Sequence, residues 1–325
     1  MRMFTPSRIC CAVVIALSTL PCARAQEWPA KTVRIINPAS AGGVSDVIGR
    51  TVAQHFTTTF GQNFVVDNRP GANGLIGLEM VAKAAPDGYT LLAGTSGMLV
   101  MNSAIYPKMA FNVMRDFAPI SIVISAPFAI FVHPSLPVKT TKELIALAKA
   151  RPGQLPYGSF GPASFAHMAM ELFMLQTATR MTHVPYKGGA PMATALVAGE
   201  VTVAFDSVQN QLPFLRANRV RAIAMASPKR VKLLPEIPTL AESGVQGGEL
   251  PAWYGMLAPA GTPRTIINRL YEDMVTQFKS SELRERFAAL GSEVVLNPPD
   301  QFALQLKNEI DAMTKVAREA GVKAN

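Results

Sequence analysis

The strongest constraint on the fold of this chain is a regular alternation of short β-rich runs with amphipathic helical segments. A strand is expected over residues 32–37, and a helix with one apolar face over residues 45–58. Further strands are expected at 64–67, 89–93, 120–124, 128–132, 155–159, 183–185, 201–205, 220–226 and 253–258, and further helices at 74–84, 140–151, 164–176, 191–198, 263–279, 282–289 and 301–320. Such alternation predicts an α/β fold with largely parallel sheets.

The first 25 residues have the pattern of a secretory signal peptide. Arg2 and Arg8 precede an apolar run over residues 9–20, and the small residues of a cleavage site follow at 23–25. We expect cleavage between Ala25 and Gln26 and an exported, periplasmic mature protein. A lipoprotein signal through Cys22 is the alternative, although Leu20 and Pro21 make a poor lipobox.

All three cysteines, Cys10, Cys11 and Cys22, lie in this leader. We therefore exclude a cysteine nucleophile, a cysteine-ligated zinc site and a disulfide framework from the mature chain. Three of the 31 basic residues also lie in the leader, which leaves the mature chain at a net charge of +6 against 22 acidic residues. The basic residues are scattered, which argues against nucleic acid as a partner and permits anionic solutes.

Two strand-to-helix loops resemble each other. In the first, Ser40, Gly42 and Gly43 follow a strand and open a helix; in the second, Ser159, Gly161 and Ser164 do the same. Helix N-termini carry free N–H groups and partial positive charge, so each loop could hold a carboxylate. Tight turns alone would also explain the glycines. Two such loops on facing sheet edges predict a ligand cleft between two lobes.

Other candidate ligand residues follow strands in the same way. Thr95 and Ser96, Tyr186 and Lys187, and Asp206 and Ser207 each follow or end an expected strand. Asp46 either caps the first helix or faces the cleft. His167 is the one histidine that we place near the cleft, in the first turn of its helix, and the four histidines show no i, i+4 metal-binding pair.

Eight sequence motifs occur in the order typical of one known family. They are residues 28–46 (from Trp-Pro-Ala-Lys to Gly-Gly-Val-Ser-Asp), 67–72, 86–91, 115–120, 157–159, 184–188, 234–239 and 258–263. On these motifs the mature chain resembles the tripartite tricarboxylate transporter substrate-binding proteins, also called the Bug or TctC family.

The resemblance implies a type II periplasmic binding protein, a Venus flytrap that closes around a small carboxylate. The expected parts are a signal peptide at 1–25, a first lobe at 26–126 plus 251–325, and a second lobe at 127–250. We expect no cofactor, no metal and no catalysis. The implied ligand loops contain Ala39, Ser40, Ala41, Gly42, Gly43, Asp46, Thr95, Ser96, Ser159, Phe160, Gly161, Ser164, His167, Tyr186, Lys187, Asp206 and Ser207.

The chain also departs from the family pattern. Many relatives carry an aromatic residue before the Gly-Gly turn, whereas this chain has small residues at 37–41, which predicts a roomier or wetter wall. Phe160, Phe165 and Phe205 are expected to form an apolar wall in the second lobe. No arginine lies in a ligand loop, so an arginine-clamped carboxylate is not expected.

Three functions follow from the sequence. The first is a monomeric receptor that passes an organic acid to the permease subunits of a tripartite tricarboxylate transporter. The second is a carboxylate sensor that signals to a membrane receptor. The third is a secreted serine hydrolase using Ser159 or Ser96 with His167, but no G-x-S-x-G nucleophile motif is present.

Overall fold

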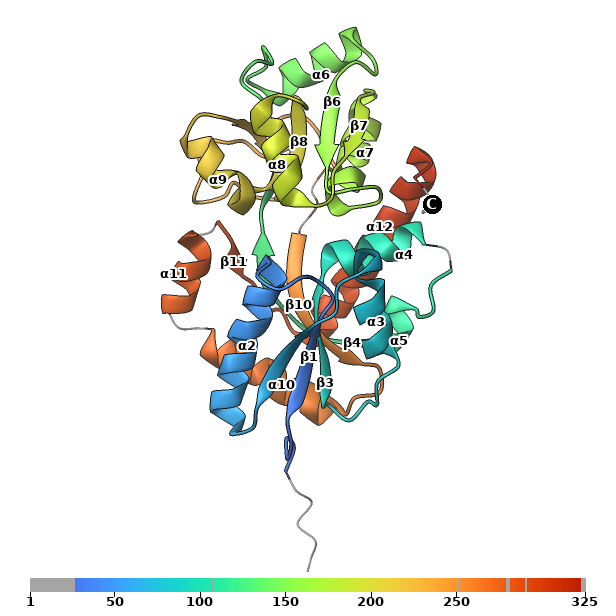
Figure 1. Ribbon diagram of the computed structural model, residues 1–325, viewed down its shortest axis with the longest axis vertical. Helices are drawn as coiled ribbons and strands as arrows, with labels where there is room; N and C mark the ends of the chain where they lie inside the picture. The colour runs from blue at the N-terminus through green and yellow to red at the C-terminus, as the bar shows by residue number, and fades with distance from the viewer. Residues whose placement is uncertain are drawn as a thin grey trace, which may run out of the picture.

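The computed structural model describes residues 27–322, apart from residues 107, 249, 251, 279–280 and 290. The predicted signal peptide and its cleavage site lie outside the described residues. The described chain forms two lobes, each built on its own sheet, with one lobe above the other in Figure 1. No helix among the described residues is long and apolar enough to cross a bilayer.

The lower lobe contains a six-stranded sheet with the order β11-β4-β10-β3-β1-β2. Its strands are β1 (Val33–Asn37), β2 (Phe64–Asn68), β3 (Thr90–Thr95), β4 (Phe117–Ala126), β10 (Ala252–Pro259) and β11 (Glu293–Val294). Its helices are α2 (Val44–Phe60), η1 (Ala72–Gly74), α3 (Leu75–Ala82), η2 (Gly97–Met101), α4 (Asn102–Ile105), α5 (Val113–Asp116), α10 (Arg264–Gln277), α11 (Ser281–Ala289) and α12 (Pro299–Ala320).

The upper lobe contains a five-stranded sheet with the order β7-β6-β8-β5-β9. Its strands are β5 (Phe128–Val132), β6 (Pro156–Ser159), β7 (Thr182–Pro185), β8 (Val203–Ser207) and β9 (Arg221–Met225). Its helices are α6 (Thr141–Ala150), α7 (Phe165–Thr177), α8 (Gly189–Ala198) and α9 (Val208–Arg216). The chain enters this sheet from β4 to β5 and leaves it from β9 to β10. Our proposed lobe boundaries stay at Ala126–Pro127 and Leu250–Pro251.

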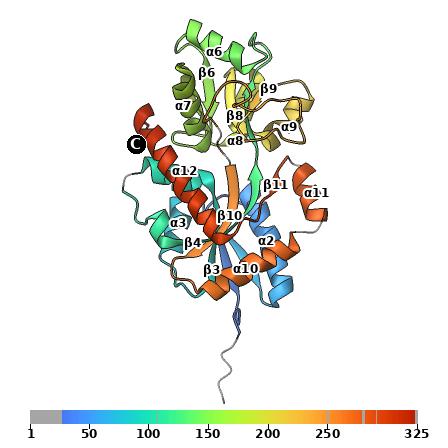
Figure 2. The same cartoon turned by 180° about the vertical axis from the view of Figure 1, so that it is seen from behind.

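Both faces of the lower sheet are covered by helices, which explains why its central strands are apolar at consecutive positions. In β1, Ile35 packs with α2 and α10 on one face. Its neighbour Ile36 packs with α3 and α12 on the other face. Seen from behind in Figure 2, α12 crosses the back of this lobe, and it reaches α7 of the upper lobe.

Every strand and helix expected from the sequence is present, with small shifts at the ends. The expectation of largely parallel sheets is wrong. In the lower sheet β10 lies between β3 and β4 and is antiparallel to both; in the upper sheet β5 lies between β8 and β9 and is antiparallel to both. Periodicity reports the type of each element but not its direction, and these strands lie beside the two crossings between lobes.

The sequence also missed several short elements: η1, η2, α4, α5, α9 and β11. Helix α9 was missed because it contains Pro213, which lacks the N–H that a helix interior uses.

Candidate functional site

A cleft of about 840 Å³ lies between the lobes and is lined by loops of both sheets. The lower lobe contributes the loops after β1, β2 and β3, and the upper lobe contributes the loops after β6 and β7. Trp253 and Tyr254 at the start of β10 form part of the wall. Parallel strands of both lobes therefore end at this cleft, as expected for a ligand site of an open α/β sheet.

The first wall of the cleft is the loop between β1 and α2. Gly42 has a φ of +81°, a left-handed conformation that favours glycine. The turn that it makes brings Gly43, Val44 and Ser45 to the cleft wall. No side chain caps α2 at its N-cap residue Gly43. The N–H groups of its first turn, which have no acceptor within the helix, are therefore available to a ligand. In Figure 1 this end of α2 points toward the upper lobe.

Asp46 holds this loop from behind. The buried carboxylate accepts hydrogen bonds from the N–H of Gly42 (2.9 Å), Nε of Arg50 (3.0 Å) and Nδ2 of Asn68 (3.0 Å). Burial alone raises the pKa of Asp46, but these hydrogen bonds outweigh burial and leave the pKa below its usual value. Asp46 takes neither of the two places that we expected: the N-cap residue of α2 is Gly43, and Asp46 lies outside the cleft lining and holds the preceding turn through the N–H of Gly42.

The second predicted loop is arranged differently from the first. The Oγ of Ser159 is buried and bonded to Nε2 of His183 (2.6 Å) and to the N–H of Gly161 (3.1 Å). Ser164 caps α7, since its side chain accepts from the N–H of His167. From this loop, Phe160 and Ser164 line the cleft and Ser159 does not. The first turn of α7 is therefore partly satisfied within the protein.

The free helix terminus of the upper lobe belongs instead to α8. Gly188, with a φ of +107°, is its N-cap residue and supplies no side-chain cap. Residues 187–191 all line the cleft. Pro191 costs the helix no hydrogen bond because a first-turn N–H would have no helical acceptor. The N–H groups of Gly189 and Ala190 remain as donors without a partner within the helix.

Gly189 also has a packing reason to be glycine. A Cβ atom there would lie 2.9 Å from Nδ2 of Asn210, which lines the same cleft. Asn210 in turn donates to Oδ1 of Asp206 (3.1 Å). The start of α8 and the start of α9 therefore pack together directly behind the cleft wall.

Asp206 is fully buried and accepts hydrogen bonds from Gln211, Asn210 and the N–H of Ser207. Burial raises the pKa of Asp206 to about 7, against the effect of those hydrogen bonds. Burial and the charge of Asp206 raise the pKa of Tyr254 to about 12, so this phenol in the cleft wall is neutral. Asp206 is therefore a buried, only partly ionised group that holds α9.

Ten of the predicted site residues line the cleft, and their contact with a ligand stays a prediction. They are Ala39, Ser40, Ala41, Gly42, Gly43, Thr95, Ser96, Phe160, Ser164 and Lys187. Seven lie outside its lining: Asp46, Ser159, Gly161, His167, Tyr186, Asp206 and Ser207. Five of these seven lie beside the loops but are engaged within the protein: Asp46, Ser159, His167, Asp206 and Ser207 accept hydrogen bonds from neighbouring groups. Tyr186 packs against the apolar cluster beneath α8.

The predicted apolar wall is present in part. Phe160 and Phe165 line the cleft. Phe205 does not, because it is buried behind Phe128, whose ring stacks on it with centroids 5.6 Å apart. Phe128, Trp253 and Tyr254 are wall residues that the sequence analysis missed, since only the strand order shows that β5 and β10 pass the cleft.

The charge of the cleft is one-sided. Among the described residues that line it, Lys187 is the one charged side chain and none is acidic. The uncapped N-termini of α2 and α8 add partial positive charge from opposite lobes, and the short helix α3 also begins uncapped at the cleft, at Gly74. Apolar side chains make up much of the remaining wall. The arrangement suits an anion with a partly apolar body.

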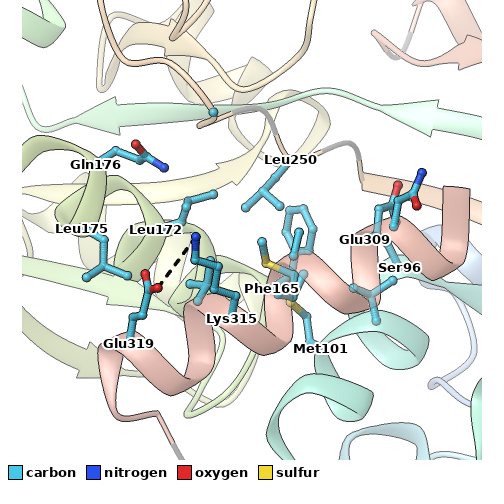
Figure 3. Close-up of a pocket in the computed structure, with 16 residues that line it drawn as sticks. Ser96, Met101, Phe165, Leu172, Leu175, Gln176, Leu250, Glu309, Lys315 and Glu319 are labelled. Carbon is cyan, nitrogen blue, oxygen red and sulfur yellow. Dashed lines mark ion pairs between the residues drawn. The ribbon is translucent and has the colours of Figure 1, made fainter.

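A second cavity of about 370 Å³ lies between α12 and α7 (Figure 3). Apolar side chains dominate its lining, and it also contains Glu309, Lys315 and Glu319. The indole Nε1 of Trp253 donates to Oε2 of Glu309 (2.7 Å), and burial raises the pKa of Glu309. With two carboxyl side chains and no free terminus of a long helix, this cavity is less suited to an anion than the cleft.

The comparisons with known proteins agree with this geometry. Residues 48–322 match the family model described as Tripartite tricarboxylate transporter family receptor. The chain belongs to this family, whose members are periplasmic solute-binding proteins. BugT of Bordetella pertussis is 35% identical over 300 residues, which is 92% of this chain and 92% of BugT.

Two solved structures of relatives contain carboxylates. Rpa4515 of R. palustris, solved with adipate, is 35% identical with a TM-score of 0.81, covering 91% of this chain and 99% of that chain. MatC from Rhodopseudomonas palustris, solved with bound malate, is 30% identical with a TM-score of 0.78, covering 89% of this chain and 99% of that chain. The predicted family and the two-lobed binding-protein fold are confirmed.

Replacing Asp46 by Asn should destabilise the first loop. The asparagine amide keeps one acceptor oxygen, but its NH2 group cannot accept the hydrogen bonds that the second carboxylate oxygen receives. We therefore expect the unfolding free energy at pH 7 to fall by about 1–2 kcal/mol. Since the native pKa of Asp46 is lowered, its stabilisation is present above the unfolded pKa and is lost as pH falls through the native value. Urea unfolding of both proteins from pH 7 to pH 2.5 should show the difference shrinking in acid. A difference that stays constant would contradict this role.

Proposed function

We propose that the mature protein is a monomeric periplasmic receptor that binds a small organic carboxylate in the cleft between its lobes. It then delivers the solute to the permease subunits of a tripartite tricarboxylate transporter. The observation that carries the proposal is the pair of uncapped N-termini, of α2 and α8, which line one cleft from opposite lobes. An anion between them is held by both lobes, which favours closure around the ligand.

The relatives and the electrostatics support the same ligand class. Rpa4515 was solved with adipate and MatC with malate, both dicarboxylates. In this chain the described lining offers main-chain N–H groups, one lysine and hydroxyl groups, but no arginine. Such a site recognises carboxylate charge mainly through the backbone. The aromatic wall from Phe128, Phe160 and Trp253 favours ligands with an aliphatic or aromatic body.

The hydrolase hypothesis lacks the geometry it needs. Ser159 is buried and bonded to His183, not to His167. The Oγ of Ser96 accepts from the N–H of Trp253, and Nδ1 of His167 accepts from the N–H of Ala163. A serine nucleophile needs a basic partner and access to its substrate; Ser159 has His183 as its partner, but this serine is buried and lies outside the cleft lining.

Thermal-shift and calorimetric titrations of the chain from Gln26 should detect ionised carboxylates. The panel contains succinate, malate, adipate, citrate and benzoate, with adipamide as a neutral match to adipate. A ligand at 100 times its Kd stabilises the protein by about 2.7 kcal/mol, which gives a clear rise in Tm. Equal binding of adipamide and adipate, or no binding by any carboxylate, would contradict the proposal.

Replacing Gly43 by Val should abolish carboxylate binding without unfolding the protein. Gly43 has a φ of −75°, and an added Cβ would meet only the carbonyl oxygen of Ser40 at 3.5 Å, so the backbone accepts a side chain. A branched side chain at this position would crowd the free N–H groups of α2. Tm without ligand serves as the folding control. Retained affinity would remove this loop from the site.

Replacing Lys187 by Met should weaken carboxylate binding by up to about fivefold, because an exposed charge contributes up to about 1 kcal/mol. The loss should shrink as salt rises, since salt screens exposed charges. Lys232→Met removes another exposed lysine of the same lobe that lies outside the cleft lining, and should leave Kd unchanged. Equal effects of the two variants would indicate a general charge effect and not a contact.

A further inference from the structure

A cluster of titratable side chains lies behind the loop at residues 159–164. It contains Tyr157 and Ser159 from β6, His167 and Glu171 from α7, and His183 from β7. The two imidazole rings stack with centroids 3.9 Å apart and planes 6° from parallel. The hydroxyl of Tyr157 donates to Oε1 of Glu171 (2.8 Å), which lies 3.5 Å from Nε2 of His167. None of these side chains lines the cleft.

The hydrogen bonds determine which nitrogen of His167 carries a proton. The N–H of Ala163 donates to Nδ1 of His167 (3.0 Å), so Nδ1 must present a lone pair. In the neutral ring the proton is then on Nε2, on the side of Glu171. If Nδ1 were protonated, its N–H would face the N–H of Ala163, and the hydrogen bond between His167 and Ala163 would be lost.

Ala163 is the residue whose position depends on that bond. Its φ of +62° is uncommon for a residue with a side chain, and such a conformation persists only where neighbours hold it. On the other side of the loop, Ser159 bonds both to Gly161 and to His183. Phe160 and Ser164 of this loop line the cleft, and the carbonyl of Phe160 accepts from the N–H of Gly188 at the start of α8 (3.2 Å).

We propose that the stacked pair His167 and His183 positions the loop at residues 159–164. Protonation of His167 then releases this loop and lowers the affinity for the carboxylate ligand in acid. The titratable side chains that face His167 are Glu171 on its own helix, His183 on β7 and Tyr157 on β6. Tyr157 is neutral near pH 7, since burial raises its pKa. Burial, with help from His167, lowers the pKa of His183 to about 4, so His183 is neutral in the resting cluster.

Two variants of His167 separate positioning from simple packing. His167→Asn keeps an acceptor oxygen near the place of Nδ1 but does not titrate. His167→Leu fills similar space without an acceptor. The inference rests on the proposed function, so adipate is the probe, and its own ionisation is common to all three proteins and cancels in the comparison.

Isothermal titration with adipate from pH 7.5 to pH 5 provides the test. Wild type should lose affinity by about fivefold more than His167→Asn on acidification, the effect of about one hydrogen bond. His167→Leu should bind weakly at every pH, and His167→Asn should restore most of that loss at pH 7.5. Equal pH dependence in wild type and His167→Asn would overturn the proposal.

An NMR titration of the ligand-free protein keeps this result separate from the choice of ligand. In wild type, the amide resonances of Gly161 and Ala163 should shift together with the imidazole nitrogens of His167 as pH falls. In His167→Asn they should stay constant. If adipate fails to bind but these shifts occur, the ligand assignment fails and the positioning device stands. If the amides do not follow His167, the positioning device is wrong.

Discussion

The structure depends on hydrogen-bond donors that helices cannot satisfy for themselves. Helices α2 and α8 both begin at the cleft, both have glycine as N-cap residue, and neither receives a side-chain cap. Helix α6, in contrast, begins with a complete capping box at Thr140 and Glu143. Helices α10 and α12 also lack a side-chain cap, but their N-cap residues are Pro263 and Pro298 and neither helix begins at the cleft. Because the two facing helices α2 and α8 lack side-chain caps, their backbone N–H groups form a binding site for negative charge. The missing caps lower the stability of the fold until an anion binds.

Acidic groups are arranged to support this site without entering it. Asp46 holds the first loop from the side away from the ligand and remains ionised. Asp206 holds the start of α9, and its burial raises its pKa toward neutrality, which reduces the repulsion of an anion. The second loop is held by the uncharged Ser159 and the two histidines. Negative charge is therefore kept behind the wall, and the donors face the cleft.

Much of this could be predicted from the sequence. Strand and helix periodicity located every long element, and small residues after β1 identified the first loop. Direction and strand order could not be predicted, so Trp253 and Tyr254, which reach the cleft through β10, were missed. In the second lobe, side-chain hydroxyls did not identify the free helix terminus. Ser159 and Ser164 have the right residue type and place, but their hydrogen bonds are used inside the loop, and the bare terminus at Gly188 is the one left free.

A crystal structure of the protein with adipate tests the central claim most directly. The account predicts one carboxylate within hydrogen-bond distance of the first-turn N–H groups of α2, and main-chain donors of α8 on the same ligand from the opposite lobe. Ordered water in place of both sets of direct contacts would contradict this arrangement. Adipate bound in the cavity between α12 and α7, or in the cleft without contact to either helix start, would contradict it.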